Sequence, residues 1–337
     1  MDSLTQIALG AAVGLAVRGR RTAPWKAALT GAVLGTLPDL DAFVDHGDPI
    51  RNMTFHRTES HALFYLTLLA PALAWLVARL WREAEDFRAW WLAVWLILVT
   101  HPLLDLMTVY GTQLGLPFTD HPFAVGSVFI IDPLYTLPLL AGVIAALALR
   151  TPRGLRGNQA GLLLSTLYLA WSVGAQAHVR DLAQAELARQ GIRAERLLVT
   201  PTPFNTVLWR VLAMSPDGRY HEGFRSLLDR EPGIRFDAFA QQRELAGALP
   251  GNWELARMQW FSHGFYRLRE QTGTLVISDL RMGQEPHYTF NFALAQRTPQ
   301  GFRAVPVEAR PSLPDLRRSL AWLWRRLGGE PVAPPRD

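Results

Sequence analysis

The chain has 337 residues, of which 49 % are hydrophobic, with no cysteine and a formal net charge of +5 at pH 7. The missing cysteine excludes disulfides and thiolate metal ligands, so His, Asp or Glu must hold any metal ion. Most of the early arginines flank apolar runs, which fits membrane topology better than nucleic-acid binding, and we expect no nucleic-acid partner. The first 21 residues lack a basic n-region and a clear cleavage site, so we expect no removed signal peptide.

Six apolar segments fill the first half of the chain. Residues 4–17 and 25–37 are rich in Gly and Ala and shorter than the ~20 residues that a lone span needs, so they are either closely packed spans or re-entrant pieces. Four longer segments follow, at residues 61–80, 89–107, 129–149 and 159–177. A buried core helix explains any one of them, but four in succession predict a helical membrane domain of about four to six spans over residues 1–178.

Basic residues in the connections predict the orientation. If all six segments cross the membrane, the odd-numbered connections carry ten basic residues, and the even-numbered ones carry two, Arg51 and Arg57. The positive-inside rule then places the odd-numbered connections in the cytoplasm. We therefore predict a multi-pass protein of a bacterial inner membrane, with both termini and the C-terminal domain on the periplasmic side.

The pattern changes after residue 178. A helical stretch that ends at Gly191 precedes short runs of alternating polar and apolar residues, which are separated by turn signals such as S-P-D-G and Q-T-G. This pattern predicts a small extramembrane domain of α+β class, rich in antiparallel strands, over residues 179–312.

Residues 313–337 form a third piece, which begins with an amphipathic helix. Four leucines at helical spacing share one face and four arginines surround it: Leu316, Leu320, Leu323 and Leu327, with Arg317, Arg318, Arg325 and Arg326. This helix either lies on a membrane surface or packs on the β-rich domain. We expect the Pro-rich end, residues 331–337, to be disordered.

Ionisable residues in and beside the apolar segments form four clusters. Ionisable groups at membrane depth are costly and are usually functional. Each cluster also has a plain structural explanation, such as a solvated capping turn, a topology charge, or an N-cap at Ser60 before the third segment. The clusters are Asp39 with Asp41, His56 with Arg57 and His61, His101 with Asp105, and Asp132 alone.

The third cluster predicts a metal centre. His101 and Asp105 are one turn apart on one helix face, so they can bind one ion together, and in the six-span topology the other clusters reach the same outer depth. Carboxylates and imidazoles predict a divalent metal, with zinc expected and manganese as the alternative. Asp39 and Asp41 point the same way in an extended segment and diverge in a turn. We expect both to reach the site, one as a ligand and the other as the base or a second ligand.

Five stretches resemble the YdjM-like family of membrane-bound, metal-dependent hydrolases: MDSLTQIALGAAVG, GTLPDLDAF, HRTESHALF, HPLLDLMTVYGTQL and FIIDPLYTLPLL. The family is described as related to zinc-dependent phospholipase C through its Asp, His and His-x-x-x-Asp pattern. Many relatives carry a histidine where this chain has Gln6. The resemblance implies these ligands: Asp39, Asp41, His61, His101 and Asp105, with His56 nearby. We add Arg57 and Asp132 as accessory residues.

The residues and the resemblance together predict a membrane-bound metal-dependent hydrolase. Its expected substrate is a phosphoester of a membrane lipid or lipid-linked molecule at the outer membrane–water interface, and its expected catalytic carboxylates are Asp39 and Asp41. Two other functions stay open. A non-catalytic protein would use a structural metal or ion pairs to hold its helices together, and an ion-coupled transporter would use Asp105 and Asp132 as carriers.

Overall fold

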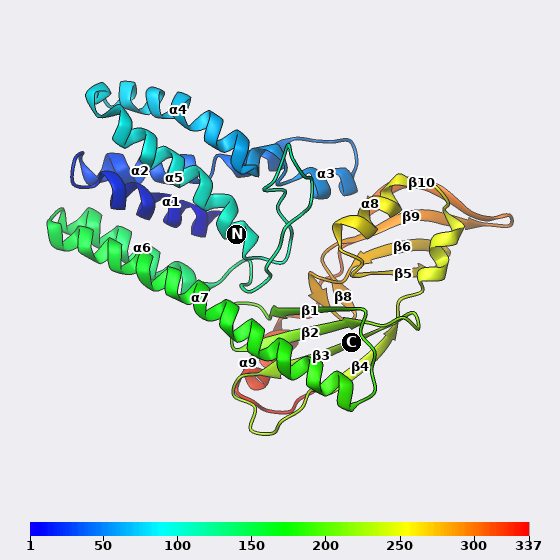
Figure 1. Ribbon diagram of the computed structural model, residues 1–337. Coiled ribbons are helices and arrows are strands. Elements are labelled where there is room, and N and C mark those ends of the chain that lie inside the picture. The colour runs from blue at the N-terminus through cyan, green and yellow to red at the C-terminus, as the bar shows by residue number, and fades with distance from the viewer. Residues whose placement is uncertain (337) are drawn as a thin grey trace. The chain divides into compact units, whose positions relative to one another are not determined.

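The computed structural model describes residues 1–336, which form two compact units. The first unit comprises Met1–Val44, Arg57–Gly174 and Pro203–Asn205. The second comprises Asp45–His56, Ala175–Thr202 and the chain from Thr206 onward. Helix α7 (Pro152–Arg189) begins in the first unit and ends in the second (Figure 1).

The first unit is helical. Within residues 1–336, three helices are long and apolar enough to cross a membrane, and two shorter ones, α1 and α6, are apolar as well. The elements are α1 (Ser3–Arg18), α2 (Pro24–Gly35), η1 (Pro38–Phe43), η2 (Glu59–His61), α4 (Leu63–Leu80), η3 (Ala84–Asp86), α5 (Phe87–Leu106), α6 (Pro133–Leu149) and α7. The predicted helical membrane domain is confirmed. The segment predicted at residues 159–177 and the helix predicted to end at Gly191 are one continuous α7.

Glycines let α1 and α2 pack closely, side by side (Figure 1). A Cβ atom added to Gly31 would lie 2.0 Å from the carbonyl oxygen of Gly10, and one added to Gly14 would lie 2.4 Å from the carbonyl oxygen of Ala27. The two backbones therefore touch, as the small residues of these segments predict. At 16 and 12 residues, α1 and α2 are about 24 and 18 Å long, shorter than the ~30 Å hydrocarbon core.

The first, third and fifth connections of the helical unit meet at one end. The Arg18 guanidinium, at the end of α1, lies 2.8 Å from Glu83 and 3.0 Å from Asp86 in the connection between α4 and α5. A Cβ atom added to Gly19 would lie 2.7 Å from Leu155 at the start of α7. The three connections predicted to share one side of the membrane are thus neighbours, and the side that they face stays a prediction.

The second unit is rich in antiparallel strands, as predicted. Two four-stranded sheets have the orders β1-β2-β3-β4 and β10-β9-β6-β5, and β7 pairs with β8 in a two-stranded sheet. The strands are β1 (Arg196–Pro201), β2 (Leu208–Met214), β3 (Arg219–Ser226), β4 (Phe236–Ala240), β5 (Tyr266–Gln271), β6 (Thr274–Asp279), β7 (Gly283–Gln284), β8 (His287–Tyr288), β9 (Asn291–Thr298) and β10 (Gly301–Ala309). The unit also contains α3 (Pro49–Phe55), η4 (Arg243–Ala248) and α8 (Trp253–Phe261).

Turn chemistry and burial explain this arrangement. The predicted turns join β2 to β3 and β5 to β6, where Gly218 and Gly273 adopt φ values of 79° and 76° that favour glycine. Buried side chains of the first sheet, such as Trp209 and Val211, pack against Val179 of α7. The long helix is thereby part of the core of the second unit.

The C-terminal helix α9 (Leu316–Leu327) packs on the first sheet through Trp322 and Leu323, which lie beside Phe224. In the chain that follows, the Trp322 indole donates to the carbonyl of Val332, and the Arg336 guanidinium lies 3.1 Å from Glu222 and 2.6 Å from Asp237. The disorder expected for residues 331–337 stays a prediction. Asp337 lies outside the described residues.

Candidate metal centre

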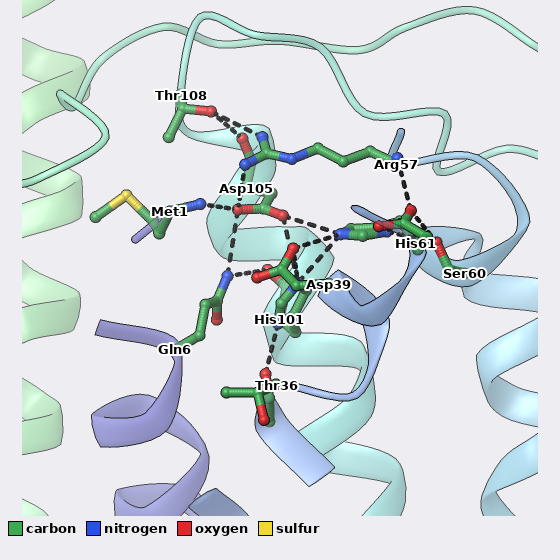
Figure 2. A network of polar contacts seen from close by, with 12 residues as sticks. Met1, Gln6, Thr36, Asp39, Arg57, Ser60, His61, His101, Asp105 and Thr108 are labelled. Carbon is green, nitrogen blue, oxygen red and sulfur yellow. Dashed lines mark hydrogen bonds and ion pairs between the residues drawn. The ribbon is translucent and has the colours of Figure 1, made fainter. Parts of the chain in front are cut away.

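Four ionisable side chains from three elements of the first unit meet at one point (Figure 2). His101 and Asp105 lie one turn apart near the end of α5, Asp39 lies in η1, and His61 ends η2. His61, His101 and Asp105 are buried, while Asp39 is partly exposed. All four are among the predicted ligands.

Five of the six distances between the four donor atoms are close to the edge length of a tetrahedron around one zinc ion. The Nε2 atoms of His61 and His101 are 3.1 Å apart. The first lies 3.3 Å, and the second 3.4 Å, from both Asp39 Oδ1 and Asp105 Oδ2. A regular tetrahedron with such edges has its centre about 2.0 Å from each corner, which matches zinc–nitrogen and zinc–oxygen bonds. The spacing therefore fits a single tetrahedral zinc ion.

A helix end sets the tautomer of His101. Its Nδ1 atom lies 2.6 Å from the carbonyl oxygen of Gly35, the last residue of α2. Because a carbonyl oxygen only accepts, Nδ1 carries the proton and donates it. In the neutral ring the Nε2 lone pair then faces the centre. The contact also satisfies a carbonyl at a helix end, where four carbonyls lack intrahelical partners.

Ser60 and Asp41 set the tautomer of His61 in the same way. The Ser60 hydroxyl donates to Asp41 Oδ2 over 2.6 Å, so its oxygen accepts from His61 Nδ1 at 2.8 Å. Asp41 Oδ2 is itself 3.5 Å from that nitrogen and also accepts from the backbone N–H of Arg57 over 2.9 Å. The neutral His61 ring thus also directs its Nε2 lone pair into the centre, as second-shell carboxylates commonly arrange around metal-binding histidines.

This geometry calls for a cation. Two neutral imidazoles cannot hydrogen-bond through two lone pairs, so the 3.1 Å contact needs a proton or a metal ion between them. Asp105 Oδ2 faces the same space, and no donor among residues 1–336 hydrogen-bonds to it. A buried oxygen without a donor is costly. A metal ion would bind all of these atoms at once.

The second oxygen of Asp105 faces three hydrogen-bond donors, of which two are cationic. Arg57 Nη2 and Gln6 Nε2 each lie 3.2 Å from Oδ1, and the α-ammonium group of Met1 contacts the same atom (Figure 2). Arg57 reaches it from a left-handed backbone with φ of 65°, and its Nη1 lies 3.3 Å from the Thr108 hydroxyl. These contacts hold one carboxylate oxygen away from the centre and leave the other for it.

The charged groups also shift the proton affinities of the site. Burial raises the pKa of the Asp39 carboxyl, but hydrogen bonds with His101 and His61 outweigh burial and hold the pKa below its usual range. Burial lowers the pKa of His61, but the neighbouring carboxylates of Asp105, Asp39 and Asp41 outweigh burial and raise the pKa to about 9. Without a metal ion, His61 therefore carries the proton that the centre requires.

Solvent reaches the centre at Asp39. Its side chain is 21 % exposed, whereas those of His61, His101 and Asp105 are 0 %, 1 % and 0 % exposed. The same short helix, η1, exposes Leu40 and Phe43. Any water or substrate therefore arrives beside Asp39 and next to apolar side chains.

The remaining predicted residues are not among these four donors. Asp41 contacts the Nδ1 side of the His61 ring and not the Nε2 side, because η1 is a 3₁₀-helix in which residues two apart point about 120° apart. Asp132 caps α6 by accepting from the backbone N–H of Leu134 and also accepts from the Tyr168 hydroxyl, so its contacts are those of a capping acid. His56 directly follows α3 and belongs to the second unit, and its role as a ligand stays a prediction.

Besides Met1 and Gln6, which contact Asp105, three further contributors were not predicted. Gly35 acts through its backbone carbonyl, and Thr108 donates to the carbonyl oxygen of Asp105 over 2.7 Å. Ser60 was interpreted as an N-cap, but its hydroxyl joins Asp41 to His61, and α4 has no side-chain cap. The sequence signal for Ser60 was its position directly before a histidine, and that signal is weak.

Comparisons with known proteins agree with the membrane character of the chain. The profile of the family described as "YdjM inner membrane protein" matches residues 1–179. The uncharacterized protein YfhP of Bacillus subtilis (strain 168) is 26 % identical over 247 residues, which cover 68 % of this chain and 71 % of YfhP. The inner membrane protein YbcI of Escherichia coli (strain K12) is 30 % identical over 123 residues, 36 % of this chain and 69 % of YbcI. No solved structure matches.

Proposed function

The chain belongs to the YdjM inner membrane protein family, and from that premise we propose that it is a membrane-bound hydrolase with a metal ion at Asp39, His61, His101 and Asp105. The observation that carries the proposal is the spacing of four donor atoms around one point, with both imidazole lone pairs facing it. Two nitrogen and two oxygen donors in a tetrahedron favour zinc, whereas manganese prefers more oxygen ligands.

The residues around the ion have different proposed roles in the reaction. A zinc ion supplies Lewis acidity to water and to phosphoryl or carbonyl oxygens. Asp39, which solvent reaches, takes the proton from the attacking water. Asp41 acts through Ser60 to orient His61, and Arg57 holds Asp105, so both are positioning residues.

The exposed side chains beside Asp39 support a lipid substrate. Leu40, Phe43 and Val44 are 54 %, 86 % and 54 % exposed. Apolar side chains next to a polar centre suit a molecule with an acyl chain and a charged headgroup. We therefore propose a phosphoester of a membrane lipid or lipid-linked molecule as the substrate.

A structural metal is the second candidate, and one observation favours it. Four protein donors meet at one point, and sites closed by four protein ligands are typical of structural zinc, whereas catalytic zinc keeps one position for water. The enzyme therefore requires Asp39 to leave or share its position, and Asp39 is the one member of the four with solvent access.

The pair Asp39→Asn and Asp41→Asn tests these roles in purified, detergent-solubilised protein. Bound zinc is measured by elemental analysis, and turnover is measured with a phospholipid-type phosphoester. We expect Asp39→Asn to keep zinc on the three buried ligands and to lose turnover. We expect Asp41→Asn to weaken zinc binding by about 10–100-fold and to recover turnover in excess zinc. His121→Ala, an exposed residue outside the centre, is the control.

The outcomes separate the two functions. Parental turnover in Asp39→Asn would remove the proposed base. Zinc that is present in the parent and needed for its folding, without turnover of any phosphoester or acyl ester tested, would establish the structural role instead.

A further inference from the structure

The sheet covers part of the apolar surface of helix α9. Trp322 and Leu323 are buried against Phe224. Leu316, Leu320 and Trp324 are 72 %, 41 % and 65 % exposed, and their spacing of four residues places them in one stripe, which runs beside Leu323. Packing on the β-rich unit therefore leaves this outer face, Leu316, Leu320 and Trp324, exposed.

Positive charge flanks this outer face. Arg317, Arg318 and Arg325 are exposed, and Arg325 lies 2.8 Å from Glu330. Asp315 is the sole acid among residues 313–327, and its carboxylate caps the helix by accepting from the backbone N–H of Arg318. The stripe is thus apolar and has arginines along one edge, with Leu313, 79 % exposed, just before it.

We propose that the outer face of α9, formed by Leu316, Leu320 and Trp324 with Arg317 and Arg325 along one edge, binds the surface of an anionic bilayer. Indole rings and leucines enter the boundary between headgroups and acyl chains, while arginines keep their guanidinium groups at the lipid phosphates.

The size of the face supports lipid over protein. A helix of 12 residues is about 18 Å long and about 10 Å wide, so its outer face is far smaller than the roughly 800 Å² per partner that a stable protein interface buries. A bilayer needs no such area, because the apolar helices of the same chain keep lipid at high effective concentration. The inference is independent of the metal centre.

The missing cysteine allows a direct test in the full-length protein. Leu316→Cys, at a highly exposed position, carries a single environment-sensitive fluorophore, and Gln300→Cys, exposed in the turn between β9 and β10, is the matched control. Each labelled protein is placed as a single copy in nanodiscs that contain either phosphatidylcholine alone or phosphatidylcholine with phosphatidylglycerol. Quenching by aqueous iodide and by headgroup-attached nitroxide lipid is then measured.

In anionic discs we expect at least twofold less iodide quenching at position 316 than at position 300, together with nitroxide quenching at position 316 alone. Adding Arg317→Glu, or raising NaCl to 0.5 M, should reverse much of this protection, because salt screens the lipid charge. Equal iodide quenching at both positions would overturn the proposal. Protection that is equal in phosphatidylcholine alone, or that needs two copies per disc, would overturn it as well.

Discussion

Zinc binding at the centre should depend steeply on pH. The ion needs the Nε2 lone pair of His61. Burial lowers the pKa of His61, but contacts with Asp105, Asp39 and Asp41 outweigh burial and raise the pKa to about 9. Below that pH the ion must displace a proton, so its apparent affinity should rise about tenfold per pH unit and level off near pH 9. At pH 7 the affinity should be about 100-fold below its plateau.

The same shift predicts how the metal-free protein responds to pH. The folded-state pKa of His61 lies above its unfolded value, so the bound proton stabilises the fold fully below about pH 6.5 and loses this effect as the pH rises through about 9. The loss amounts to about 3 kcal/mol, at 1.36 kcal/mol per pKa unit. Saturating zinc should therefore raise the melting temperature more at pH 9 than at pH 6.5.

Two measurements check the pH dependence of zinc affinity and of stability. The apparent zinc affinity is obtained by competition with a chelating indicator in detergent between pH 6 and 9, and thermal unfolding is followed with and without zinc at both ends of that range. His121→Ala should give the parental slope. An affinity that stays constant between pH 6 and 8, after correction for the indicator, would refute the assignment of the shared proton to His61.

Three further changes probe the ligands, the packing and the topology. His101→Ala and Asp105→Ala should each lower zinc affinity at least tenfold. Asp105→Ala should in addition destabilise the fold by about 3–5 kcal/mol, because it leaves the buried Arg57 charge without its carboxylate. Parental zinc content in both variants would mean that the two residues are not metal ligands. Gly31→Ala should lower the melting temperature, because the added Cβ atom would meet the Gly10 carbonyl. Gly174→Ala, with open space around it, should instead raise the free energy of unfolding by roughly 0.5–1 kcal/mol. Equal effects of the two changes would contradict the close contact of α1 and α2. A reporter that is active only in the periplasm, fused after the last residue, should be active, and activity of a cytoplasmic reporter instead would reverse the predicted topology.

The local pattern of apolar and polar residues was enough to predict much of the secondary structure. The long apolar runs predict α4, α5 and α7, because a membrane span needs only length and hydrophobicity. The alternating runs and glycine turns predict the antiparallel sheets. Likewise the four-residue spacing of His101 and Asp105 fixes them on one side of a helix, since that relation depends on helical geometry alone.

Only the tertiary structure decided which groups, distant in the sequence, contact each ligand of the centre. Asp39 and Asp41 are two residues apart, yet they lie on opposite nitrogens of one imidazole, because Pro38–Phe43 forms a 3₁₀ turn and not an extended strand. The carbonyl of Gly35 reaches His101 because helix α2 ends beside α5, and no side-chain pattern records a backbone acceptor. A sequence states which donors and acceptors exist. Their partners follow from distances across the fold, since a hydrogen bond or a metal bond forms only within a few tenths of an ångström of its ideal length.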